Sequence, residues 1–151
     1  MSKKLLSFMV AALLMLSMVG AAISAEKAAD VVGPKVKAMV DAARSAIKMV
    51  PASTVKAAID SKEKVVILDV RDGGEFSAGH LPGAINISRG TLEMNVANAI
   101  PDLNAKICVY CKTAARSALA TKTLNDLGYS NVVLMDAQYA DWVKAGYPVE
   151  R

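Results

Sequence analysis

One of the two cysteines, Cys111, stands where an apolar run ends and a helical segment begins. The run is Ile-Cys-Val-Tyr at 107–110, and Lys-Thr-Ala-Ala-Arg-Ser follows the cysteine. A helix start offers unpaired backbone N–H groups and partial positive charge, to which Lys112 and Arg116 add. This environment favours the thiolate, which is the nucleophilic form of cysteine. The spacing therefore predicts a reactive sulfur at Cys111, cradled as an anion.

The second cysteine, Cys108, forms a Cys-x-x-Cys pattern with Cys111. Residues i and i+3 of a strand point to opposite faces and lie about 10 Å apart, which is too far for a disulfide without rearrangement. We therefore interpret Cys108 as a small buried apolar side chain. The alternative is a role in resolving an oxidised Cys111.

Alternating strand and helix patterns must position this sulfur. Strands are expected at 47–50, 65–68, 107–110 and 132–135, with a short strand after the loop at 81–86, and helices at 26–46, 53–59 (capped by Ser53 or Thr54), 90–99, 116–127 and 139–144. Such alternation is typical of an α/β domain with a parallel sheet, where ligands bind at the carboxyl ends of the strands. Asp69-Val70-Arg71 and Cys111 both end strands, which allows them to share one crevice.

The first 25 residues are typical of a secretory signal. Lys3 and Lys4 precede an uncharged apolar run from 5 to 22, and small residues at 22–25 offer a cleavage site. The alternative is an uncleaved membrane anchor. If the signal is cleaved after residue 25, we expect a periplasmic protein. Its chain then consists of an N-terminal helix at 26–46 and one domain at 47–151. The net charge of +4 includes the two signal lysines and gives no reason to expect a nucleic-acid partner.

Several segments, taken in order, resemble a rhodanese domain over roughly residues 45–150. They are Leu68–Arg71, Glu75-Phe76, Gly79–Asn86, the cysteine loop, Trp142 and Gly146–Pro148. Within this family the chain is most similar to periplasmic polysulfide-sulfur transferases of the Sud type, on the segments 88–90 and 111–116 and on the N-terminal helix. The resemblance implies a five-stranded parallel sheet flanked by helices, a cysteine persulfide intermediate and a homodimer. Many rhodaneses carry Gly-Gly where this chain has Ala137-Gln138, so access to the site or the choice of acceptor is expected to differ.

The length of the cysteine loop separates two chemistries. Four residues lie between Cys111 and Arg116, and a ring this short encloses about one sulfur atom. The related phosphatase pattern has one more residue, which widens the ring for a tetrahedral oxyanion, and usually a His before the Cys, where this chain has Tyr110. The loop therefore favours sulfur over phosphate or arsenate. The backbone of Thr113, Ala114, Ala115 and Ser117 is expected to surround that sulfur.

The expected function is a sulfurtransferase that works through a Cys111 persulfide. The donor is polysulfide or thiosulfate, and the acceptor is cyanide or a thiol of a partner protein. No metal and no organic cofactor are needed. The alternative is a non-catalytic periplasmic carrier that delivers sulfur to a membrane polysulfide-reducing respiratory enzyme.

Four cations are candidates for binding the anionic donor, and each has a structural alternative. Arg116 and Lys112 lie in the loop itself, where a carboxylate-paired Arg and a solvated Lys are the alternatives. Arg71 stands beside Asp72 and Glu75, so an ion pair has equal weight. Only the resemblance brings Arg89 to the site.

Three further side chains are expected to be structural. His80, the only histidine, lies in a Gly-His-Leu-Pro-Gly turn without a partner for base catalysis. Asp69 is expected to accept hydrogen bonds from the backbone or an Arg, and Trp142 is expected in the core. For Ser117 two roles remain open: it caps the helix, or it donates a hydrogen bond to the persulfide.

Overall fold

The computed structural model describes residues 30–151. The expected signal at 1–25 and the start of the expected helix at 26–46 lie outside the described residues. A helix covers residues 30–45. The chain divides into two compact units between Met39 and Val40, and the second unit contains the whole sheet. No helix among residues 30–151 is both long and apolar enough to cross a bilayer.

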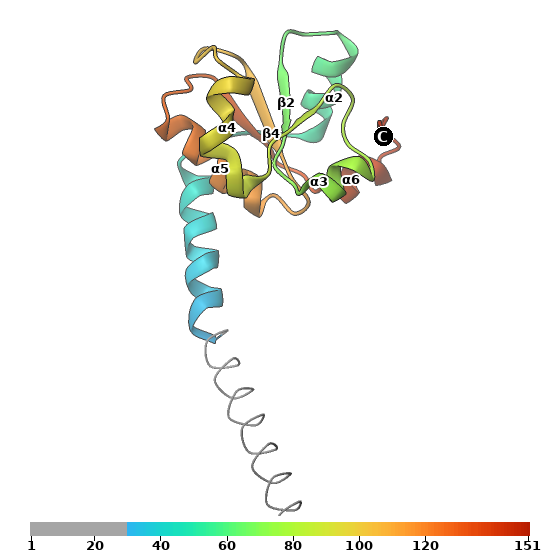
Figure 1. The fold of residues 1–151 in the computed structure, drawn as a ribbon. Coiled ribbons are helices and arrows are strands. Elements are labelled where there is room, and N and C mark those ends of the chain that lie inside the picture. The colour runs from blue at the N-terminus through green and yellow to red at the C-terminus, as the bar shows by residue number, and fades with distance from the viewer. Residues whose placement is uncertain (1–29) are drawn as a thin grey trace, which may run out of the picture. The chain divides into compact units, whose positions relative to one another are not determined.

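The sheet has five parallel strands in the order β1-β5-β4-β2-β3 (Figure 1). The strands are β1 (Lys48–Val50), β2 (Val66–Asp69), β3 (Ile85–Asn86), β4 (Ile107–Tyr110) and β5 (Val132–Met135). β4 lies in the middle, between β5 and β2, so its carboxyl end is flanked on both sides. The five-stranded parallel sheet confirms the expected fold class.

Six helical segments connect or follow the strands. They are α2 (Ala52–Asp60), α3 (Gly73–Ser77), the 3-10 turn η1 (Arg89–Thr91), α4 (Leu92–Ala99), α5 (Ala115–Asp126) and α6 (Tyr139–Lys144). The expected cap of α2 was wrong, because Pro51 is its N-cap residue and no side chain caps it. The short helix α3 was not expected from the sequence.

Two apolar layers lie on the two faces of the sheet. Side chains of β4 alternate between them, since successive residues of a strand point to opposite faces. Val109 joins the layer under α4 and α5, whereas Cys108 and Tyr110 join the layer with Trp142 of α6. Figure 1 shows α4 and α5 on one side of the sheet and α2 and α6 on the other. The central strand is therefore fully buried, which fixes the position of the loop that follows it.

Candidate active site

The sulfur of Cys111 is enclosed at the carboxyl end of β4. The residue has no exposed surface. Its Sγ accepts hydrogen bonds from the backbone N–H and from the hydroxyl of Ser117, both at 3.3 Å. Because Ser117 lies in the first turn of α5, these donors belong to a helix start, as the sequence predicted. Two donors on one buried sulfur stabilise an anionic form of that atom.

A left-handed residue shapes the loop between Cys111 and α5. Ala114 has φ 67° and ψ −8°, which costs a residue with a Cβ roughly 1–2 kcal/mol. Its carbonyl accepts the N–H of Ala118 at 3.0 Å and lies 3.2 Å from the hydroxyl of Ser117. Thr113 is exposed, and Ala115 is half-buried. The strained turn therefore joins β4 to α5, and the hydrogen bonds to the sulfur come from Ser117.

Arg116 is held from outside the loop by two carboxylates. Its Nη1 lies 2.8 Å from Glu75 Oε2 and 3.3 Å from Asp72 Oδ2. Both acids come from α3, where Asp72 is the N-cap residue and Glu75 bonds back to the Asp72 N–H. The hydrogen bond from Arg116 lowers the pKa of Glu75. The predicted loop cation is thus present at the site and paired.

Arg71 points into the interior of the protein and not toward the surface, where a sulfur donor would approach. Its guanidinium makes hydrogen bonds of 2.6–3.0 Å to both oxygens of Asp69 and of 2.7 Å to the Gly79 carbonyl. It also lies 4.1 Å from the ring centre of Tyr139. An ion pair was one of the two sequence interpretations, but its expected partners, Asp72 and Glu75, were wrong. Only 3% of Arg71 is exposed, so the structure does not bring its charge to the surface of the site.

Arg89 and Lys112 lie in different settings. Arg89 pairs with Glu93 at 2.9 Å and donates to Thr123 Oγ1 at 3.1 Å. Thr123 is eight residues beyond Ala115, about 12 Å along α5, so the structure does not bring Arg89 to the cysteine loop. Lys112 is exposed next to the sulfur, and its Nζ has no ion pair within residues 30–151.

The segment that departs from the rhodanese pattern touches the cysteine loop. The Tyr139 N–H donates to the Lys112 carbonyl at 3.2 Å. Gln138 is the N-cap residue of α6 and forms a capping box with Asp141. Ala137-Gln138 therefore borders the site, which is where the sequence placed it.

The remaining candidates are structural. Cys108 is buried on the opposite face from Cys111, both thiols are free, and burial raises the pKa of Cys108 to about 12. His80 stacks on Phe76 with ring centres 3.8 Å apart. Trp142 is fully buried, as expected.

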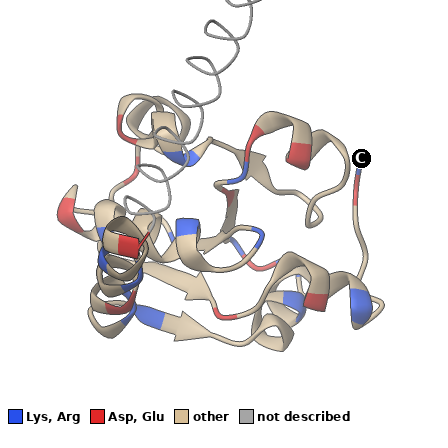
Figure 2. Ribbon diagram, turned by 90° about the horizontal axis from the view of Figure 1, so that it is seen from below, with Lys and Arg blue, Asp and Glu red and all other residues tan. Residues whose placement is uncertain are grey.

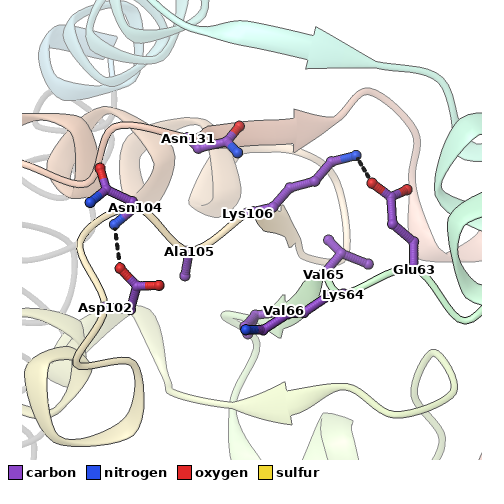
Figure 3. A pocket seen from close by; sticks show the side chains of 9 residues that line it. All are labelled: Glu63, Lys64, Val65, Val66, Asp102, Asn104, Ala105, Lys106 and Asn131. Carbon is purple, nitrogen blue, oxygen red and sulfur yellow. Dashed lines mark hydrogen bonds and ion pairs between the residues drawn. The ribbon is translucent and has the colours of Figure 1, made fainter.

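A cavity of about 390 Å³ lies at the other end of the sheet (Figure 3). Val66 begins β2 there, and Lys106, which pairs with Glu63, directly precedes β4. The cavity is therefore remote from the carboxyl ends of the strands, where parallel α/β sheets bind ligands.

No cluster of metal-ligating side chains occurs within the described part of the chain. Figure 2 shows that the positions of Lys and Arg and those of Asp and Glu are interspersed along the ribbon.

The rhodanese-like domain family matches residues 51–145. Because the match covers well over half of the 151 residues, the chain belongs to the rhodanese-like domain family.

Several individual proteins are similar to this chain. Thiosulfate sulfurtransferase PspE of Escherichia coli is 35% identical over 65 residues, which are 43% of this chain and 62% of that protein. The polysulfide-sulfur transferase homodimer of Wolinella succinogenes has a TM-score of 0.68 at 28% identity, covering 82% of this chain and 92% of that chain. A Rhodopseudomonas palustris protein of unknown function, described as a possible tyrosine phosphatase, has a TM-score of 0.71 at 33% identity, covering 76% and 93%.

The chain spans 62% of PspE and 52% of another curated relative, YrkF of Bacillus subtilis. The named sulfurtransferases support sulfurtransferase activity at the level of the family. The donor and acceptor of this chain are a separate question.

Proposed function

We propose that the protein transfers sulfane sulfur from polysulfide or thiosulfate to a thiophilic acceptor through a persulfide on Cys111. The observation that carries the proposal is the enclosed Cys111 sulfur, with two donors from Ser117 at 3.3 Å in a loop of four residues before Arg116. The start of α5 supplies fixed donors for a sulfur anion at this position.

In the first half-reaction the Cys111 thiolate attacks the outer sulfur of the donor. A new S–S bond forms to Cys111, and the S–S bond within the donor breaks. The leaving group takes the electron pair, so thiosulfate releases sulfite, and a polysulfide dianion releases the dianion one sulfur shorter. The product is a cysteine persulfide with one negative charge on its outer sulfur.

In the second half-reaction an acceptor nucleophile attacks that outer sulfur. Cyanide forms thiocyanate, and the electron pair of the broken S–S bond returns to Cys111 as thiolate. A thiolate of a partner protein would leave with a persulfide in the same way. Neither half-reaction requires an oxidant, and double-displacement kinetics are expected. The two hydrogen-bond donors of Ser117 and the positive charge of the exposed Lys112 stabilise the negative charge on sulfur in both steps.

The experiment is the intact mass of the protein before and after incubation with each donor, and again after cyanide. We expect a gain of whole sulfur atoms that cyanide removes, absent in Cys111→Ser and present in the matched variant Cys108→Ala. No gain from either donor would overturn the proposal. Stoichiometric loading with only slow release to cyanide would favour the sulfur carrier, and turnover of an aryl phosphate at Cys111 would favour the phosphatase.

A homodimer and export to the periplasm belong to the same proposal. Val32, Val36 and Met39 recur at helical spacing and are 49–61% exposed, which forms an apolar stripe. The stripe, and the Wolinella relative described as a homodimer, support self-association. Sedimentation of the mature chain tests it, since Val36→Lys should shift a dimer to monomer. A monomer at the highest concentration would contradict self-association.

The N-terminal sequence of the exported protein tests cleavage after residue 25.

A further inference from the structure

The site carries far less free positive charge than its sequence indicates. Of the four cations proposed to bind the donor, three are paired with carboxylates in the structure. Arg71 pairs with Asp69, Arg89 with Glu93, and Arg116 with both Asp72 and Glu75. At the mouth of the loop, the charges of Arg116 and Lys112 are matched by those of two acids.

The two acids form a fixed clamp on Arg116, which we call the carboxylate clamp (Asp72 and Glu75). Both contact the same atom, Nη1, at 3.3 Å and 2.8 Å. The clamp is stiff because Glu75 Oε2 also accepts the Asp72 N–H at 3.3 Å, within the capping box that begins α3. The side chain of Asp72 is 77% exposed and that of Arg116 is 32% exposed, so a donor approaching Arg116 meets the carboxylates.

We propose that Asp72 and Glu75 determine donor specificity by competing with the donor for Arg116. The clamp disfavours a dianion such as thiosulfate relative to a monoanionic sulfane donor, such as an organic persulfide (RSS⁻) or an organic thiosulfonate (RSO₂S⁻). In either case Cys111 takes the outer sulfur, and the thiolate RS⁻ or the sulfinate RSO₂⁻ leaves with the electron pair of the broken S–S bond. The physical reason is that each carboxylate repels a dianion twice as strongly as a monoanion. This inference rests on the proposed function, because it concerns the donor that loads Cys111.

The test compares donors within one protein. For wild type, Glu75→Gln and Asp72→Asn, kcat/KM is measured with thiosulfate and with a monoanionic organic thiosulfonate, with cyanide as acceptor. The thiosulfate-to-thiosulfonate ratio should rise about two- to threefold in each variant, and the rise should shrink at high salt. Asn at position 72 keeps a good N-cap. A ratio of two rates from one sample is not altered by partial loss of folded protein.

Asp126→Asn is the matched control. Asp126 pairs with Lys122 on the exposed face of α5, ten residues beyond Arg116, which is about 15 Å along the helix. Its removal changes the net charge by the same amount and should leave the ratio unchanged. An unchanged ratio in both clamp variants would overturn the proposal. A lower ratio would also overturn it, since the carboxylates would then position Arg116 for the donor.

A second measurement does not depend on turnover. Sulfate, an unreactive dianion, should protect Cys111 from alkylation by neutral iodoacetamide at a several-fold lower concentration in Glu75→Gln than in wild type. Equal protection, or none in either protein, would overturn the clamp. A failure of the proposed function gives a different result from a failure of the clamp. In that case the mass of the wild-type protein does not increase by any sulfur atom after incubation with a donor.

Discussion

Substitution of Ser117 by Ala tests the central feature of the site. The hydroxyl of Ser117 lies 3.3 Å from Cys111 Sγ and 3.2 Å from the Ala114 carbonyl, so its single proton is divided between two acceptors. A hydrogen bond to a charged group contributes about 1.5–3 kcal/mol, and one that is shared contributes about 1–1.5 kcal/mol. The Ser117 N–H still donates to sulfur in the variant.

That free energy corresponds to about a five- to twelvefold decrease in kcat/KM for persulfide formation. The assay is the rate of thiocyanate release at limiting thiosulfate or polysulfide, with the rate of Cys111 alkylation at neutral pH as a second readout. Both rates should fall together, because both depend on an anionic sulfur. The thermal midpoint should change little, since Ala118 N–H still pairs with the Ala114 carbonyl.

The chain offers a matched control one turn further along α5. Thr121 is fully buried, and its hydroxyl has no hydrogen-bond partner among residues 30–151. Thr121→Val removes a buried hydroxyl of similar size without removing a hydrogen bond, so it should leave kcat/KM unchanged and stability equal or higher. A decrease of less than twofold in Ser117→Ala, or equal decreases in both variants, would refute the assignment of the hydroxyl to the sulfur.

Three further predictions follow from the charged and buried groups. Asp69→Asn should lower the free energy of unfolding by about 3–5 kcal/mol in urea titrations, because it leaves the buried Arg71 without its counter-charge; a loss below about 1 kcal/mol would contradict this. The pKa of Glu75 is lowered in the folded state, so its contribution is present above its unfolded value near 4.5 and is lost as pH falls through the folded one; Glu75→Gln should flatten the fall in stability below about pH 5, and an unchanged profile would count against the ion pair. Cys108, with its pKa near 12, should resist iodoacetamide at pH 8 in the folded protein and react after unfolding, and mass spectra showing two labels on the folded chain would disprove its burial.

The positions of the regular elements were predictable where the signal is local. The apolar runs at 107–110 and 132–135 became β4 and β5 with the expected bounds, and 139–144 became α6. α3 was missed because Gly73-Gly74 is a poor helix former, and the helix is held by the Asp72 and Glu75 capping box. Whether a side chain caps a helix depends on the backbone turn before that helix. The pattern of residue types does not determine this turn.

The sequence by itself determined where the sulfur of Cys111 lies in the fold. A buried strand, a cysteine at its end and a helix that begins after three intervening residues are all encoded within one segment, and the enclosed Cys111 follows from them. The alternation of elements likewise determined a parallel sheet, because each crossover is formed by neighbouring residues.

The tertiary structure alone decided which charges remain available at the site. Arg116 and Glu75 are 41 positions apart, and they meet because β2 and β4 are adjacent in the sheet and both loops leave from the same end. The sheet order likewise decided that Arg89 reaches Thr123 rather than the sulfur. Residue types fix the charge of each group, but Coulomb energy depends on the distance between groups, and that distance is set only when the strands assemble.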